Sequence, residues 1–300
     1  MGQCATVSID CAGDFVRFMR DELAAMNIPL SPTVSPDEVF ITFYDAKNRR
    51  LSPKQRKFFA APTLAVPPEH EAGFDLLKAK VEAGDDLSPH LSLRIESSDK
   101  PDGLLIDWGI YHFHLGTTPH KKAPNFMART GPLLYARVTS DAFYAIAVVD
   151  HGSWTNKDLL EQLHAHFPES LEEFRMEGIV GLEHNNSEDD HALLRENGIV
   201  GFVSLEDGTV LMPPGLGFTS NGRTSVQATL WMHKARRMLG AYQRHVEGLA
   251  DRLAADISAA MLAQGKATHD HYQLKFGVLG DSACAFEEES NTCFELGPIP

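Results

Sequence analysis

The 300-residue chain lacks most of the features that mark membrane proteins, disulfide-rich proteins and disordered proteins. It has no run of 18 or more apolar residues, which a transmembrane helix would need. Its start, MGQCATVSIDCAGDF, has neither the basic head nor the apolar stretch of a signal peptide. The four cysteines, at 4, 11, 284 and 293, form no CxxC pair and no zinc-like spacing. We therefore expect a cytoplasmic protein with reduced thiols and no membrane partner.

Acidic residues are missing from three windows of a chain that is acidic as a whole. The chain carries 27 Lys and Arg against 41 Asp and Glu, a formal charge of −14. Residues 46–57, 111–140 and 208–246 nevertheless contain several Lys or Arg and no carboxylate. An evenly acidic surface would repel a nucleic acid, but basic windows can hold a polyanion locally. The composition is therefore compatible with weak, salt-sensitive RNA binding.

Hydrophobic periodicity predicts a mixture of helices and antiparallel strands, typical of an α+β fold. We expect a central antiparallel sheet with flanking helices, followed by a C-terminal hairpin, a long helix and terminal strands. The predicted helices are 13–26, 53–59, 69–83, 155–167 and 224–263, the last broken near Gly240 or Gly248; the predicted strands are 39–44, 104–115, 133–138, 143–149, 199–205 and 209–212, with further strands in 272–296.

Four segments follow from this pattern. We predict an N-terminal α/β segment at 1–68, an α-βββ-α catalytic domain at 69–168, an acidic linker at 169–194 and a C-terminal α+β region of unknown role at 195–300.

The strongest chemical signal is a pair of histidines in the strand predicted to end near residue 115. Alternation along a strand places Tyr111 and Phe113 on the core face, so that His112 and His114 face solvent or a cleft. If the three middle strands are adjacent and antiparallel, Arg129 and His151 lie near the same edge. Imidazoles and cations together suit RNA cleavage without a metal, with one His as the base, another as the acid and Arg stabilising the charged phosphate. The predicted catalytic residues are His112, His114, Arg129 and His151, and the predicted substrate-binding residues are Lys121, Lys122, Arg137 and Trp154.

Two other functions remain open from the same residues. The spacing of His112 and His114 also suits a zinc-dependent hydrolase, with His120, Asp150 or His151 as a third ligand. Alternatively, the chain is a non-catalytic binding or regulatory protein that dimerises through the helix predicted at 224–263. The paired histidines would then be an ordinary polar strand face.

A family resemblance favours the ribonuclease. The stretches HFHLG, RTGPLLYARVTSD and FYAIAVVDHGSW resemble the strand succession of RelE-type ribonuclease toxins, within the broader barnase/EndoU/colicin-like nuclease group. This resemblance covers residues 69–168. It implies that His151 takes the family's position just after the third strand and that Arg129 or Arg137 contacts phosphate. It also implies a bacterial toxin or defence effector with RNA as substrate, no cofactor, and an antitoxin or regulatory protein as partner.

Overall fold

The computed structural model describes residues 5–97, 102–150, 157–184, 186–197, 199, 201–213 and 225–299. The chain divides into two compact units, one formed by both ends of the chain (1–43 and 229–300) and one by the middle (44–228). Each contains helices and a sheet, which confirms the α+β class. None of the helices described is both long enough and apolar enough to cross a membrane.

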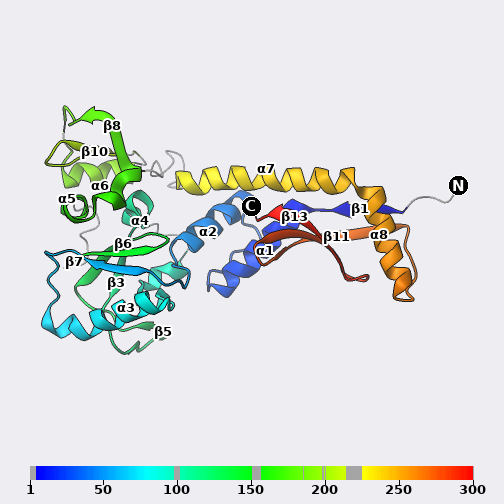
Figure 1. The fold of residues 1–300 in the computed structure, drawn as a ribbon, viewed down its shortest axis with the longest axis horizontal. Helices are drawn as coiled ribbons and strands as arrows, with labels where there is room; N and C mark the ends of the chain where they lie inside the picture. Colours follow the sequence, from blue (N-terminus) through cyan, green and yellow to red (C-terminus); the bar gives the residue numbers. More distant parts are fainter. Residues whose placement is uncertain are drawn as a thin grey trace. The chain divides into compact units, whose positions relative to one another are not determined.

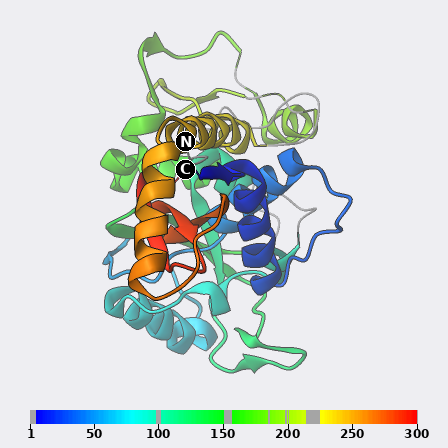
Figure 2. The same cartoon turned by 90° about the vertical axis from the view of Figure 1, so that its right-hand side faces the viewer.

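The terminal unit is built on a four-stranded sheet in the order β1-β11-β12-β13 (Figures 1 and 2). Strand β1 runs parallel to β11, and the other two pairs are antiparallel. Along β11, Tyr272, Leu274 and Phe276 are buried while the residues between them are exposed, so one face of the sheet is covered. The elements are β1 (Thr6–Ile9), α1 (Cys11–Ala25), α2 (Pro36–Asn48, ending in the middle unit), α7 (Val226–Gly248, beginning there), α8 (Ala250–Ala263), β11 (His271–Leu279), β12 (Ser282–Glu287) and β13 (Thr292–Pro298).

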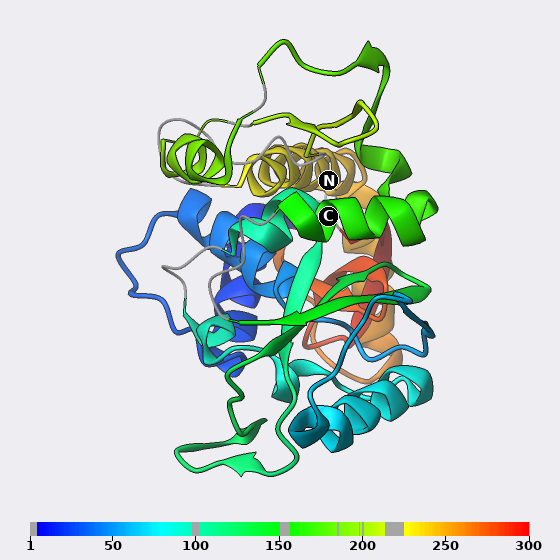
Figure 3. The same cartoon turned by 90° about the vertical axis from the view of Figure 1, so that its left-hand side faces the viewer.

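The middle unit contains the sheet predicted to hold the site, in the order β2-β7-β6-β3. Strand β2 is parallel to β7, whereas β6 pairs antiparallel with both β7 and β3. Helices α3 and α5 lie on opposite sides of these strands (Figure 3), and each contributes to a different apolar core. The elements around this sheet are β2 (Lys57–Ala60), α3 (Glu71–Ala83), α4 (Gly103–Trp108), β3 (Ile110–His114), β6 (Leu133–Val138), β7 (Ala142–Val149) and α5 (Lys157–His166).

Smaller elements complete the middle unit. A three-stranded sheet has the order β8-β10-β9, and a hairpin pairs β4 with β5. They are β4 (Pro119–His120), β5 (Ala123–Met127), β8 (Arg175–Val180), α6 (Glu188–Glu196), β9 (Val203–Ser204), β10 (Thr209–Leu211) and the 3₁₀ helices Pro68–His70, Ser88–His90, Leu93–Glu96 and Pro168–Phe174.

Several predicted elements are confirmed with small changes in their ends. Helix α3 stops at Gly84, whose φ of +83° is a left-handed cap that favours glycine. The long C-terminal helix is interrupted after Gly248, one of the two predicted sites. The middle hairpin, helix α5 and the three terminal strands are also present; the suggested caps of α5, Ser153 and Thr155, lie outside the described residues.

Four predictions of local structure are wrong. Residues 39–44 belong to helix α2, which Ser35 and Glu38 open as a capping box, each side chain accepting from the other's backbone N–H. The segment predicted as a helix at 53–59 contributes β2, because Phe58 packs between Phe74 and Phe143. Residues 103–108 form α4 rather than the start of a strand. The predicted linker carries a 3₁₀ helix, β8 and α6.

The units do not follow the segments suggested by the sequence. The boundaries at 68 and 168 fall inside the middle unit, because β2 adds a strand to its sheet and residues 168–174 pack on its core. Residues 1–43 instead share a unit with the C-terminal strands, because β1 pairs with β11.

Candidate functional site

The three middle strands meet as the sequence predicted. His114 at the end of β3 pairs with Leu133 at the start of β6, and Leu133 pairs with Val149 at the end of β7. The end of β3, the start of β6 and the end of β7 therefore lie side by side at the same end of the sheet. His151 and Trp154, which follow β7, lie outside the described residues.

His112 forms an acid–base pair with a residue that the sequence analysis missed. Asp102 caps the start of helix α4, where its Oδ1 accepts from the Leu105 N–H at 3.2 Å, and Gly109, with a φ of +63°, caps the end. This tight reversal into β3 brings Asp102 Oδ2 to 3.3 Å from His112 Nδ1. About a quarter of each side chain is exposed, so the pair reaches solvent. The missed signal was the N-cap Asp102 with a glycine stop seven residues later.

One aromatic residue supports this pair from the neighbouring strand. Tyr135 pairs directly with His112, and the two rings lie 6.1 Å apart. Burial raises the pKa of Tyr135 to about 12, and the charge of Asp102 contributes in the same direction. The phenol is therefore neutral at physiological pH and packs against the imidazole rather than competing with it for protons.

The prediction that His114 faces solvent or a cleft is wrong. Both faces of the sheet are covered, and His114 is only 2% exposed. Its Nδ1 accepts from the Thr130 N–H at 3.2 Å, and its carbonyl accepts from His90 Nδ1 at 2.9 Å. His114 therefore holds the turn before β6 and does not reach substrate in this arrangement.

Arg137, predicted to bind substrate, instead makes structural contacts inside the middle unit. Its Nε donates to the Ser170 carbonyl at 2.6 Å, its Nη1 to the Trp108 carbonyl at 2.7 Å, and its Nη2 pairs with Glu173. The guanidinium carbon lies 4.5 Å from the centre of the Phe174 ring. The side chain is buried and its pKa is lowered by that burial. These contacts join β6 to residues 168–174 and hold the guanidinium in the interior.

The other three cationic residues predicted for the site lie between β3 and β6 in the chain: Lys121, Lys122 and Arg129. Lys121 and Lys122 form the exposed turn of the β4–β5 hairpin, and Arg129 is an exposed residue next to Thr130. His120 holds the turn, because its Nδ1 accepts from the N–H groups of Lys122 and Ala123. The hairpin therefore offers two ammonium groups at its tip.

The zinc alternative has no ligand cluster in the part of the chain that the structure describes. No group of three or more His, Cys, Asp or Glu side chains there is arranged to hold a metal ion. His112, His114 and His120 each direct Nδ1 to a different local partner.

The chain matches no family model, no curated protein and no solved structure. The functional argument therefore rests on the geometry of this chain and on the motifs in its sequence.

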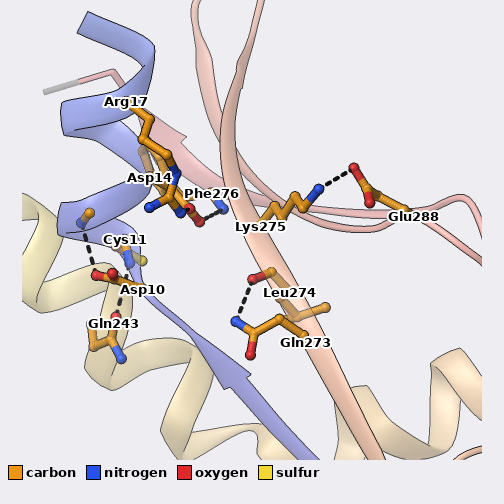
Figure 4. A network of polar contacts seen from close by, with 11 residues as sticks. Asp10, Cys11, Asp14, Arg17, Gln243, Gln273, Leu274, Lys275, Phe276 and Glu288 are labelled. Atoms are coloured by element: carbon orange, nitrogen blue, oxygen red, sulfur yellow. Dashed lines mark hydrogen bonds and ion pairs between the residues drawn. The ribbon is translucent and has the colours of Figure 1, made fainter. Parts of the chain in front are cut away.

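A second polar network lies in the terminal unit, where α1 follows β1 (Figure 4). Asp14 Oδ2 accepts from the Phe276 N–H at 2.7 Å and its other oxygen pairs with Arg17. The Gln243 side chain accepts from Cys11 N–H at 3.1 Å and donates to the Ile9 carbonyl at 2.7 Å. Because β1 ends opposite Leu274, Asp14 supplies the acceptor that a longer β1 would have given Phe276. This network is structural.

The exposed side of the same sheet carries a polar cluster around His271. His271 Nδ1 lies 2.9 Å from Thr6 Oγ1, and its Nε2 lies 2.8 Å from Ser8 Oγ. Ser8 in turn donates to the Gln273 side chain at 2.7 Å. These contacts join β1 to β11 across an open face, and the spacing of Thr6 and Ser8 along one strand is the only sequence signal for them.

Proposed function

We propose that the chain is a metal-independent ribonuclease in which the His112–Asp102 pair acts as the general base. The observation that carries the proposal is the 3.3 Å contact between His112 Nδ1 and Asp102 Oδ2, in a pair that stays partly exposed. A carboxylate at this position favours the tautomer with the proton on Nδ1, in which the lone pair of Nε2 is the group that accepts a proton from substrate. The RelE-type resemblance of the surrounding strands supports the same chemistry.

In this proposal, Nε2 of His112 removes the proton from a ribose 2′-hydroxyl. The resulting alkoxide attacks the adjacent phosphate, and the 5′-oxygen leaves with a proton from a second acid. His151 is the proposed acid, on the sequence argument alone. Arg129, Lys121 and Lys122 belong to an acid-free stretch of sequence and would offset the charge that develops on phosphate. RNA is therefore the proposed substrate, in preference to a zinc-dependent hydrolysis or a purely regulatory role.

The test is cleavage of a labelled RNA by the full-length chain in the presence of EDTA. We expect His112→Asn to lower kcat about 10²–10⁴-fold, the usual contribution of a positioned acid–base group. Asp102→Asn should also lower kcat, because the imidazole would remain but the carboxylate that sets its tautomer would be lost. The product should carry a 2′,3′-cyclic phosphate.

A matched control is available in the same unit. His164 Nε2 lies 2.8 Å from Asp207 Oδ2, so it is a second histidine–aspartate pair, at a distance from β3 in the sequence. His164→Asn should leave cleavage unchanged. An inactive wild type, equal activity of the His112 variant, or activity that depends on added zinc would each contradict the proposal.

A further inference from the structure

Two cysteines lie as diagonal neighbours on the paired strands β12 and β13. Cys284 is opposite Glu295 and Cys293 is opposite Phe286, so the two thiols leave the same face of the sheet, one step apart. The pairing is irregular between Ala283 and Cys284, at the start of this step. Diagonal neighbours on one face of two paired strands are close enough for their side chains to interact.

The environments of the two thiols differ. Cys293 is exposed, whereas Cys284 is 2% exposed although it is on the open side of the sheet. Gly277, directly opposite Cys284, has no side chain, and the Phe286 ring fills the space beside it: a Cβ at Gly277 would lie 2.7 Å from that ring. Burial, and after it the neighbouring Cys293 thiol, raises the pKa of Cys284 to about 11.

We propose that Cys284 and Cys293 form a reversible intramolecular disulfide, with a low-molecular-weight disulfide such as oxidised glutathione as the oxidant. The exposed Cys293 thiolate attacks glutathione disulfide and releases one glutathione thiolate, giving a mixed disulfide. Cys284 then loses its proton to solvent and attacks Cys293 Sγ, releasing the second glutathione. Two protein thiols lose two electrons and two protons, and one glutathione disulfide becomes two glutathione molecules.

The order of the two steps follows from the surroundings. The first attack needs an accessible sulfur, which Cys293 supplies. The buried Cys284 is poorly ionised and shielded, so it is the resolving thiol, reacting only after its neighbour has been activated. Cys11 is excluded from this exchange, because it lies on α1, is 1% exposed and has a pKa raised to about 12 by burial.

The bond would join β12 to β13 across the turn at Ser290 and Asn291. Strand β13 is the outer strand of its sheet. An outer strand held on only one side is the part of a sheet that opens most readily. Oxidation would therefore slow the exchange of backbone N–H groups in β13 and raise the melting temperature of the terminal unit.

The experiment equilibrates the folded full-length chain with glutathione buffers of increasing oxidised fraction, then blocks free thiols and maps peptides by mass spectrometry. We expect a linked pair of peptides carrying Cys284 and Cys293, two hydrogens lighter than the reduced pair, at least tenfold more abundant than glutathione-modified Cys293. Cys284→Ser should instead accumulate glutathione on Cys293. Cys293→Ser should leave Cys284 unmodified, and Cys11 should stay unmodified throughout.

Persistent glutathione on wild-type Cys293 without the internal link would overturn the proposal, as would a link that forms only in denaturant or only between two chains. Cys293→Ser replaces an exposed side chain, so it tests the first step even if Cys284→Ser proves unstable. Circular dichroism checks that each variant is folded. The result is independent of RNA cleavage, which is assayed on the reduced protein.

Discussion

At the scale of single residues, burial sets the charge of Asp45 in helix α2. Desolvation raises the pKa of this carboxyl group to about 6, and the nearby Arg49 offsets only part of that effect. The folded state therefore holds the proton more tightly than the unfolded state, whose pKa is near the ordinary value of about 4. This contribution to stability is complete below pH 4 and is lost as the pH rises through 6.

Asp45→Asn should therefore stabilise the protein at neutral pH. We expect a gain of about 1–3 kcal/mol in the free energy of unfolding at pH 7.5, because a shift of two pKa units corresponds to about 3 kcal/mol. The gain should vanish below pH 4, as urea denaturation across pH 3.5–7.5 would show. Glu38→Gln is the control in the same helix: Ser35 lowers the pKa of Glu38, so its loss should destabilise above pH 4. A pH-independent effect at Asp45 would contradict the argument.

The residue scale also shows what the sequence could and could not reveal about the site. Alternation placed His112 and His114 on one face, and both do lie there with Ile110. It could not show that α4, α5 and residues 168–174 cover that face, because those contacts join residues far apart in the chain. Arg137 was indistinguishable from a solvated cation until Ser170 and Glu173 were seen beside it. The sequence also did not reveal that Asp102 is a partner of His112, because the two side chains meet only through the turn at Gly109.

At the scale of elements, the contact between α3 and the end of β3 depends on one glycine. A Cβ at Gly73 would lie 1.8 Å from the Leu115 carbonyl oxygen, so a larger residue must push the helix away from the backbone. Gly73→Ala should destabilise the protein by about 1–3 kcal/mol, the usual cost of overpacking. Gly240 in α7 is the control, since its Cβ would meet only the mobile end of Arg244 at 3.4 Å.

Gly240→Ala should stabilise by about 0.5–1 kcal/mol through helix propensity alone. The same substitution in two helices is therefore expected to have opposite signs in urea denaturation. Equal stability of Gly73→Ala and wild type would mean that α3 can shift without cost.

The sequence predicted the helices and strands correctly where a clear local pattern decides the structure. It failed where a local signal was overlooked or where the pairing partner is distant in the chain. Helix α1 has an amphipathic period, and the terminal strands are separated by clear turns, so both were predictable. Residues 39–44 are rich in β-branched and aromatic side chains, which favoured a strand. The capping box at Ser35 and the buried positions Val39, Phe40 and Phe43 decide for a helix instead. Strand β2 was missed because its pairing with β7 is parallel and distant in sequence.

At the scale of the whole molecule, the two units differ in how the chain builds them. The middle unit is one continuous segment, whereas the terminal unit needs both ends of the chain, because β1 pairs with β11 across more than 260 residues. The two cores described for the middle unit contain only residues between 51 and 211. A core defect should therefore be felt mainly inside its own unit.

Two buried leucines, both fully inaccessible to solvent, test this independence. Leu134 lies in β6 of the middle unit and Leu274 in β11 of the terminal unit. Either change to Ala should cost about 2–5 kcal/mol, the usual cost of a buried leucine truncation. Hydrogen exchange followed by mass spectrometry should then show faster exchange in residues 44–228 for Leu134→Ala, and in 5–43 together with 229–299 for Leu274→Ala. The paired response of the two chain ends is the decisive feature, because a unit assembled from both termini must lose protection in both at once. Faster exchange throughout the chain in both variants would instead mean that the units unfold as one.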